Sequence, residues 1–291
     1  MHFCDAKGIL SADNGMNIYR GCTHGCIYCD SRSRCYGFTH KFEDVEVKAN
    51  AVELLETALK RKRKKCMLGT GSMTDPYMPI ERRLGNMSRV LETVYRYGFG
   101  IAFQTKSDLA LRDLDLICKI NEKTKCVVQT TLTTADDALC AKIEPNVCVT
   151  SARVRMLETL RAHGVPTVVW LCPILPYIND TAENINGIMD YCERAGVYGV
   201  ISFGMGLTLR EGNREYFYAA LDKLFPRLKQ RYVREFGGRY EVSSPNNAEL
   251  TALLRRRCEA AGIVCDNDKI FAYLREFPQA RYVQPRLFDD M

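Results

Sequence analysis

The sequence predicts an α/β protein in which six strand–helix units form a partial (β/α)6 barrel of the TIM type, followed by a mostly helical C-terminal extension. Three observations lead to this prediction: six short apolar runs, amphipathic stretches between them, and a change of pattern near residue 210. Buried parallel strands appear in a sequence as short, nearly continuous apolar runs. A closed barrel needs eight units. We therefore expect an incomplete barrel over residues 1–210 and the extension over 211–291.

The six apolar runs are short, and several contain β-branched residues. They are MNIYRG (16–21), CMLGTG (66–71), GIAFQTK (100–106), CVVQTTLT (126–133), PTVVWLCPIL (166–175) and GVISFG (199–204). Spacings of about 25 to 45 residues suit units of one strand and one helix, which favours a parallel sheet.

Helical patterns separate the strands, and several end in glycine or a basic residue, as helix C-termini prefer. The five patterns are AVELLETALKRKRK (51–64), LGNMSRVLETVYRYG (84–98), DLALRDLDLICKI (108–120), SARVRMLETLRAHG (151–164) and TAENINGIMDYCERAG (181–196). In the extension, residues 214–238 predict one long helix and residues 246–263 predict another.

Composition favours an ordinary globular protein with one large core, because the chain has 291 residues and 46% hydrophobic residues. No apolar run reaches the roughly 20 residues that span a bilayer, and the N-terminal MHFCDAKGIL lacks a secretory signal. We therefore expect a cytoplasmic protein whose 14 cysteines serve metals or chemistry rather than disulfides. The net charge of +6 comes from KRKRKK (60–65), which suits a solvated helix end.

Three cysteines lie within eight residues in RGCTHGCIYCDSR (20–32). Cys22, Cys26 and Cys29 have the spacing CxxxCxxC and follow the first predicted strand. In a [4Fe–4S] cluster, each iron usually takes one cysteine, so three cysteines leave one iron open to a small molecule. A zinc site that borrows His24 or His40, or three unrelated core thiols, are the alternatives. Elsewhere, two late cysteines at 258 and 265 are too few for another cluster, so we expect one.

The segment CTHGCIYC resembles the CxxxCxφC signature of the radical S-adenosylmethionine (SAM) superfamily, with Tyr28 at the aromatic position. The resemblance implies a partial six-unit barrel in which the open iron binds the amine and carboxylate of SAM. It also implies that one electron, from a donor such as flavodoxin or ferredoxin, cleaves SAM to methionine and a 5′-deoxyadenosyl radical. That radical abstracts hydrogen from a substrate.

A wider match, NIYRGCTHGCIYCDSRSRCYG followed by GSMTDPYMPIE, is similar to proteins related to the DNA repair enzyme spore photoproduct lyase. The similarity spans most of residues 15–205 and implies a lysine partner for the SAM carboxylate, backbone contacts to its amine, polar contacts from strand four and an ion pair over the SAM site. The implied cofactor-binding residues are Tyr28, Gly69, Thr70, Gly71, Ser72, Lys106, Thr130, Thr131, Glu144 and Arg153. Each feature has a structural alternative. The lysine could simply open a loop, the glycines could form a tight turn, the threonines could reflect β-propensity, and Glu144 with Arg153 could form a structural salt bridge.

One departure from that family concerns the hydrogen donor. Spore photoproduct lyase uses a cysteine near the end of strand two, where this chain has Ser72, and an O–H bond is far stronger than S–H. Another thiol, at Cys35, Cys66 or Cys172, could donate the hydrogen instead. The alternative, which we favour, is that the reaction differs from thymine-dimer repair. In the same loop, Asp75 and Tyr77 are candidate substrate or proton contacts, with Asp-Pro turn chemistry as the alternative.

The resemblance implies a nucleic acid or nucleotide as substrate, and hence a lyase or another radical transformation. A radical SAM enzyme acting on a peptide or small metabolite is one alternative, and a non-catalytic metal-binding adaptor is another. In the tail QPRLFDD (284–290), Gln284, Leu287 and Phe288 resemble the peptide by which bacterial replication and repair proteins bind the DNA sliding clamp. A tail folded onto its own domain is the alternative there.

Overall fold

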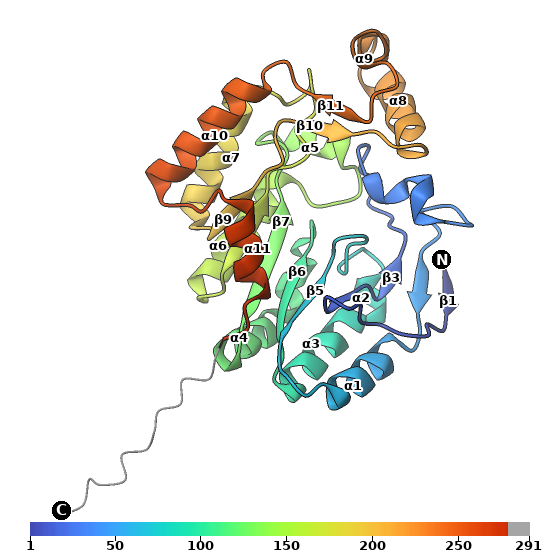
Figure 1. Ribbon diagram of the computed structural model, residues 1–291, viewed down its shortest axis with the longest axis vertical. Coiled ribbons are helices and arrows are strands. Elements are labelled where there is room, and N and C mark those ends of the chain that lie inside the picture. Colours follow the sequence, from blue (N-terminus) through green and yellow to red (C-terminus); the bar gives the residue numbers. More distant parts are fainter. Residues whose placement is uncertain (279–291) are drawn as a thin grey trace, which may run out of the picture.

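The core of the molecule is a curved sheet of six parallel strands, shown in the computed structural model, which describes residues 1–278 (Figure 1). The strands run in chain order: β2 (Gly15–Met16), β5 (Met67–Thr70), β6 (Gly100–Gln104), β7 (Cys126–Thr131), β8 (Thr167–Trp170) and β9 (Gly199–Ile201). Every neighbouring pair is parallel. The predicted six-strand partial barrel is therefore confirmed.

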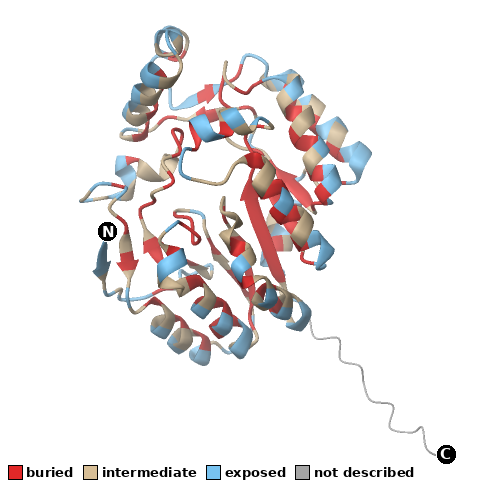
Figure 2. Ribbon diagram, turned by 180° about the vertical axis from the view of Figure 1, so that it is seen from behind, coloured by how far each residue is buried: buried red, intermediate tan, exposed pale blue. Residues whose placement is uncertain are grey.

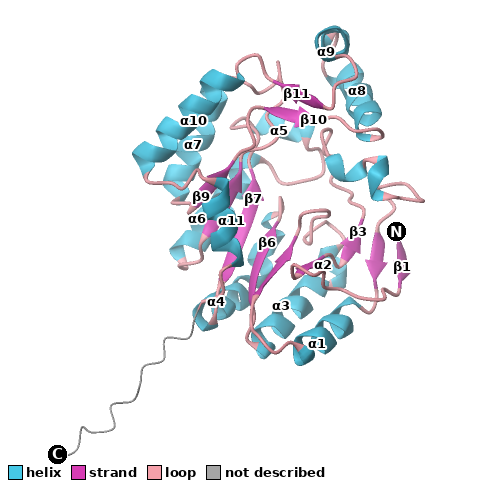
Figure 3. Ribbon diagram, viewed as in Figure 1, coloured by secondary structure: helices cyan, strands magenta, loops and turns pink. Residues whose placement is uncertain are grey.

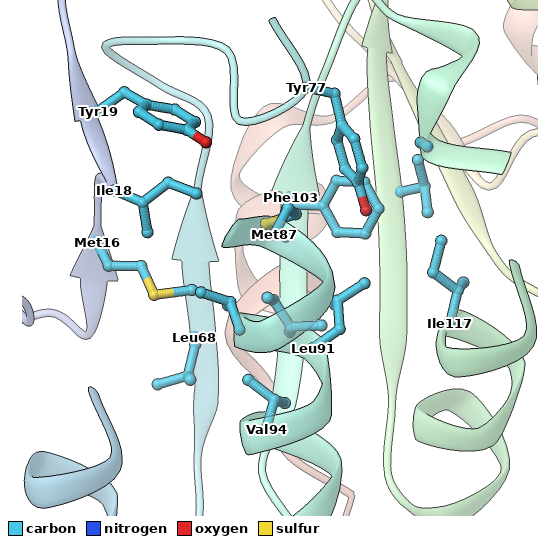
Figure 4. Packing of buried hydrophobic residues seen from close by; sticks show 14 of the residues in the cluster. Met16, Ile18, Tyr19, Leu68, Tyr77, Met87, Leu91, Val94, Phe103 and Ile117 are labelled. Carbon is cyan, nitrogen blue, oxygen red and sulfur yellow. The ribbon is translucent and has the colours of Figure 1, made fainter. Parts of the chain in front are cut away.

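Helices pack against the outer face of the sheet. Those at predicted patterns are α1 (Ala51–Arg61), α3 (Asn86–Tyr97), α4 (Leu114–Lys123), α6 (Thr150–Ala162) and α7 (Ala182–Ala195), with a 3-10 turn over Asp108–Asp113 before α4. Two short helices, α2 (Glu81–Leu84) and α5 (Asp137–Ile143), were not predicted. Figure 4 shows Leu68 and Phe103 of the sheet packed against Leu91 and Val94 of α3. The sheet is almost wholly buried while the helices expose their outer faces (Figure 2).

The first predicted strand is two strands in two sheets, so the expectation of one continuous strand over 16–21 is wrong. After β2 the chain turns, and β3 (Tyr19–Arg20) pairs antiparallel with β4 (Glu46–Lys48), which pairs parallel with β1 (His2–Cys4). Ile18 and Tyr19 are both buried although they are adjacent, which the alternation of a single strand does not allow. The cysteine loop therefore leaves from this side sheet.

The long helix predicted over 214–238 is also wrong, because it is two helices, α8 (Asn213–Leu224) and α9 (Leu228–Phe236). Pro226 lies between them; it has no N–H to donate and disfavours a helical residue before it. Arg227 then takes a φ of 70°, which reverses the chain. Both helices lie between β10 (Gly206–Thr208) and β11 (Glu241–Ser243), which pair antiparallel.

The last two helices of the described chain pack on opposite faces of the sheet. α10 (Asn247–Ala261) joins the outer layer, where Leu254 shares a buried cluster with Ile188 of α7. α11 (Asn267–Arg275) lies on the inner face, where Ile270 and Leu274 pack against aliphatic residues of the strands. A barrel–extension boundary at residue 210 stays a prediction. Within residues 1–278, no helix is long and apolar enough to cross a membrane.

Strand alternation decides which side chains face the barrel interior. Val127, Val168 and Ile201 pack with α11 on the inner face, whereas Val128 and Val169 pack with the outer helices. Because α11 fills the interior toward the amino ends of the strands, the carboxyl ends and their loops are left to form a site (Figure 3).

Candidate active site

The three cysteines of the CxxxCxxC segment line one pocket at the carboxyl end of the sheet. Cys22 and Cys26 are nearly buried, with exposed fractions of 8% and 4%, and Cys29 is partly exposed. The loops after β5 and β6 form the facing wall, and the pocket encloses about 500 Å³ of empty space, part of it open solvent. These elements lie where barrel folds place their chemistry.

Contacts with three other segments hold the cysteine loop. The amide of Cys22 donates to the carbonyl of Phe42 at 3.0 Å, and the Thr74 hydroxyl donates to the carbonyl of Gly21 at 2.6 Å. On the other side, Ile27 N donates to the carbonyl of Ile143 at 3.0 Å. Gly21 has a φ of 86°, and a Cβ there would lie 2.4 Å from the Phe42 carbonyl oxygen, so only glycine fits.

The three cysteine sulfur atoms do not form one tight group of ligand atoms in this structure. Within residues 1–278, His2, His40 and Glu46 form the only group of three such side chains with all ligand atoms within 4.8 Å of one another. Because a zinc–sulfur bond is about 2.3 Å, two thiolates on one zinc lie at most about 4.6 Å apart. At least one pair of the three cysteine sulfur atoms therefore lies more than 4.8 Å apart, farther than one zinc ion spans.

Burial and nearby charges set the protonation states of the pocket's cysteines and lysine. Burial raises the pKa of Cys22 to about 12 and raises that of Cys26, so these thiols ionise only when a metal accepts them. Burial disfavours the charge on Lys106, but the negative charges of Cys26, when it is ionised, and of Glu144 outweigh it and raise the pKa of Lys106. The lysine thus keeps its charge inside the pocket.

Asp75 braces the two loops that face the cysteines. One carboxylate oxygen accepts from the backbone of Tyr77 at 2.8 Å and from the hydroxyl of Thr105 at 2.7 Å. The other oxygen accepts from the backbone N–H of Lys106 at 2.7 Å and lies 3.5 Å from His24 Nδ1. Asp75 therefore positions the backbone of Lys106, and its lone pairs are already used within the protein.

A buried ion pair supports the cysteine loop from behind. Glu144 and Arg153 are fully buried and paired, and Tyr28 donates its hydroxyl proton to Glu144. Although burial raises the pKa of Glu144, the Arg153 charge outweighs it and the pKa is lowered. Arg153 also donates to the carbonyl of Thr131 at 2.9 Å. Tyr28, Glu144 and Arg153, although predicted to bind the cofactor, do not line the pocket. Their hydrogen bonds instead connect the cysteine loop to β7 and α6.

Of the other predicted cofactor-binding residues, some line the pocket and some do not. Gly71 and Ser72 line it, whereas Gly69 and Thr70 lie within β5. Gly71 has a φ of 100°, and a Cβ there would lie 2.2 Å from the Gln104 carbonyl oxygen, so the two loops meet only because residue 71 is glycine.

The two threonines at the end of β7 face opposite ways. Thr131 has the inward register and its hydroxyl accepts from Gln104 Nε2 at 3.2 Å. Thr130 has the outward register, is fully buried, and its hydroxyl has no hydrogen-bond partner within the described part of the chain. Only Thr131 is placed to meet a ligand in the barrel.

The candidate catalytic residues other than Asp75 are scattered. Tyr77 is fully buried, points toward Phe103 in Figure 4, and donates to Asp113 at 3.0 Å, so it has no access to a ligand in the pocket. Cys35 is exposed and outside the pocket, where it accepts from Arg210 at 3.4 Å. Neither Tyr77 nor Cys35 therefore lines the cysteine pocket.

The two remaining candidate thiols lie at opposite ends of the barrel. Cys66 precedes β5, at the amino end, and so is remote from the pocket. Cys172 follows β8, two residues after Trp170, and burial raises its pKa to about 12. Lys106 acts on that pKa in the opposite direction, as a nearby positive charge does. Cys172 therefore holds a protonated thiol just beyond the carboxyl end of β8.

Several pocket residues have no motif that sequence reasoning could use. Arg32, Phe42 and Thr105 line the pocket beside the cysteines, and Gln104 lies at the inward end of β6. The inward register of Gln104 could have been found by extending strand alternation from Ala102. The others are brought in by tertiary contacts alone.

Comparison with known proteins agrees with this geometry. A family model described as "Radical SAM superfamily" matches residues 16–192. An uncharacterized protein of Mycobacterium tuberculosis is 31% identical over 248 residues, which cover 81% of this chain and 70% of that protein. The radical SAM Nalpha-GlyT isomerase of Pseudomonas phage M6 is 22% identical, over 89% of this chain and 53% of that protein.

Among solved structures, a mutant of spore photoproduct lyase has a TM-score of 0.65 at 14% identity, covering 89% of this chain and 78% of the other. A second mutant of that enzyme, with bound AdoMet and dinucleoside spore photoproduct, has a TM-score of 0.60 at 13% identity, covering 85% and 73%. At these identities the likeness establishes a shared fold.

Proposed function

Because this chain belongs to the radical SAM superfamily, we propose that Cys22, Cys26 and Cys29 hold one [4Fe–4S] cluster and that the enzyme acts on a nucleic acid or nucleotide. When bound, the cluster and SAM supply an electron and a carbon-centred radical able to remove hydrogen from a C–H bond. The observation that carries this proposal is the convergence of the three cysteines and Lys106 on one pocket at the carboxyl end of the barrel.

Lys106 is the proposed partner of the SAM carboxylate. Its ammonium is a point charge on a flexible stem, and its pKa is raised, so it is cationic at neutral pH. Asp75 fixes the backbone at Lys106, and Cys148 Sγ lies 3.1 Å from the Lys106 carbonyl oxygen. The stem therefore starts from a fixed point, which reduces the entropy lost when the ammonium binds an anion.

The inner face of the sheet supports a substrate with a planar, hydrogen-bonding ring. Gln129 accepts from Trp170 Nε1 at 2.9 Å, beside Gln104 of the neighbouring strand. Phe203, 66% exposed, lies two residues beyond Ile201 with its ring centroid 6.1 Å from that of Trp170. Amide side chains read the edges of nucleobases and aromatic rings stack on their faces. The spore photoproduct lyase mutant solved with bound dinucleoside spore photoproduct supports the same substrate class.

Cys172 is the proposed hydrogen donor to a product radical. It lies two residues beyond the end of β8, where Lys106 acts on its pKa, and its raised pKa keeps hydrogen on Sγ. Ser72 lines the pocket but offers only a strong O–H bond. With the donor on a different strand from that of spore photoproduct lyase, we propose a reaction other than thymine-dimer repair.

Further expectations about partners and location stay proposals. A small electron donor such as flavodoxin or ferredoxin would deliver the electron, and the protein is proposed to be cytoplasmic. The peptide with Gln284 and Phe288 lies outside the described residues, so its binding to the DNA sliding clamp is a proposal from sequence alone. A binding assay of that peptide with the clamp tests it, and lack of saturable binding would end it.

Anaerobic reconstitution with iron and sulfide tests the proposed activity. The reduced protein should convert SAM to 5′-deoxyadenosine, measured by mass spectrometry, and oligonucleotides or nucleotides should raise the yield above that with peptides. Cys26→Ala is the matched control, because it should lose both iron and 5′-deoxyadenosine. Lys106→Met should keep the cluster and weaken SAM binding.

Two results would contradict the proposal. One is a single zinc per chain after purification and reconstitution without oxygen, which would favour a metal-binding adaptor. The other is a loaded cluster with no more 5′-deoxyadenosine than Cys26→Ala yields. Stimulation by peptides alone would keep the enzyme class and overturn the substrate class.

A further inference from the structure

Arg32 is a buried cation in the wall of the cysteine pocket. It ends a 3-10 turn (Asp30–Arg32) directly after Cys29, and its side chain is only 7% exposed. It lines the same pocket as the three cysteines. Burying a guanidinium is costly unless its N–H groups find acceptors.

The Arg32 guanidinium is held between two aromatic rings. Its central carbon lies 3.3 Å from the ring centroid of Tyr216 in α8 and 4.9 Å from that of Phe42. Flat stacking of this kind favours arginine over lysine. The two rings contact the cation and help to keep its side chain from solvent.

Hydrogen bonding within the protein leaves this cation partly unsatisfied. One terminal nitrogen donates to Glu43 at 2.9 Å, and Glu43 is 47% exposed, so this bond lies at the margin of the solvent. Arg32 Nε is buried and has no hydrogen-bond partner among residues 1–278. A buried donor without an acceptor is destabilising. An anionic group in the adjoining pocket would supply the missing interaction.

The segment before and within α8 fixes this arrangement. Glu211 accepts from the backbone of Arg34 at 3.0 Å, and Tyr216 donates to the carbonyl of Gly25 at 3.5 Å. At Gly212, a Cβ would lie 3.3 Å from the Arg32 carbonyl oxygen and 3.1 Å from the Arg34 nitrogen. The C-terminal region therefore covers the cysteine loop closely.

We propose that Arg32 is a positioning residue that raises the reduction potential of the cluster, and that Tyr216 holds it in place. The inference rests on the proposed cluster. A fixed positive charge favours the state with one more electron, and in a water-poor site that effect is weakly screened. Net charge and hydrogen bonds to sulfur are among the factors that set the potential of iron–sulfur clusters.

The test is the midpoint potential of the reconstituted cluster, measured by a redox titration followed by electron paramagnetic resonance. In Arg32→Gln the midpoint should become more negative, with at least a tenfold lower ratio of reduced to oxidised cluster at a fixed potential, or about 59 mV for one electron. Arg32→Lys should recover part of the shift, because it keeps the charge. Tyr216→Leu should shift the midpoint in the same direction by less.

Arg34→Gln is the matched control. Arg34 is two residues away but 73% exposed and paired with Glu211, so solvent screens it and the midpoint should stay at the wild-type value. A fully loaded Arg32→Gln with the wild-type midpoint overturns the inference, as does a shift equal to that of Arg34→Gln. If Arg32→Gln does not load, a wild-type midpoint in loaded Tyr216→Leu overturns it. A wild-type protein that never assembles a cluster instead overturns the proposed function.

Discussion

The two ends of the barrel are built from different chemistry. At the amino end the interior is aliphatic, with Ile270 and Leu274 of α11 packed on the strands. At the carboxyl end it holds Glu144, Arg153 and other buried polar groups whose pairing is needed to make burial tolerable. The amino end is held by apolar packing, whereas the carboxyl end depends on paired buried charges and carries the site, as in barrel enzymes generally.

The largest effect should come from removing one partner of the buried pair at the carboxyl end. Glu144→Ala leaves Arg153 buried without a counter-charge, which should lower the free energy of unfolding by about 3–5 kcal/mol. It should also lower cluster content, since Tyr28 loses its acceptor. Urea unfolding and iron analysis measure the two effects.

The double variant Glu144→Gln/Arg153→Met provides the control, because it removes both charges together. It should be more stable than Glu144→Ala alone. A single-variant cost below about 1 kcal/mol would contradict the view that this pair ties the cysteine loop to the barrel.

At the amino end, Ile270→Ala should cost about 2–5 kcal/mol of unfolding free energy, because it leaves a cavity among fully buried neighbours. Cluster content in the folded protein should stay at the wild-type value. Lys269→Ala, exposed on the same helix, should change stability little. Loss of cluster in folded Ile270→Ala would show that the two ends are not separable.

A smaller effect is expected from Tyr77→Phe. The hydroxyl donates to Asp113, which also accepts from Ser88 and Arg112, so no charge is left unpaired and the cost should be about 0.5–1.5 kcal/mol. Formation of 5′-deoxyadenosine should be unchanged. A tenfold loss of that product at unchanged stability would restore a catalytic role for Tyr77.

The smallest effect on stability should come from Phe203→Ser, within about 0.5 kcal/mol, because the side chain is 66% exposed. Substrate affinity should nevertheless fall by about 1–3 kcal/mol if a base stacks there. Titration of the best oligonucleotide substrate measures it, with Tyr240→Ser, another exposed aromatic, as the control. If Phe203→Ser binds the oligonucleotide as tightly as Tyr240→Ser does, Phe203 is not part of the substrate site.

Much of the fold follows from local pattern. The strands after the first, and α1, α3, α6 and α7, lie within a few residues of their predicted ranges, since buried strands and amphipathic helices leave periodic signals. The helix over 214–238 is a misreading that Pro226 could have prevented. The split between β2 and β3 had no such warning, because it depends on pairing with β4, a distant segment.

The candidate site is predictable where a motif exists and not elsewhere. Cys22, Cys26 and Cys29 carry their own spacing, so their common pocket could be expected. Arg32 is one of many arginines in the sequence, and its burial results from Tyr216, which is 184 residues later. Tyr77 lies near the motif in sequence, yet its side chain turns into the core. Nearness in sequence to a functional loop was therefore a poor guide to function.

The pairing of β10 with β11 has a consequence for how such a protein can diversify. Leu209 N donates to the Tyr240 carbonyl at 2.8 Å, so the segment between them leaves and rejoins the rest of the molecule at one point. Loop closure costs little for added length, so an excursion of this type tolerates insertion or replacement. Relatives could exchange this module through evolution, altering the surroundings of the cysteine loop while inheriting the strands intact.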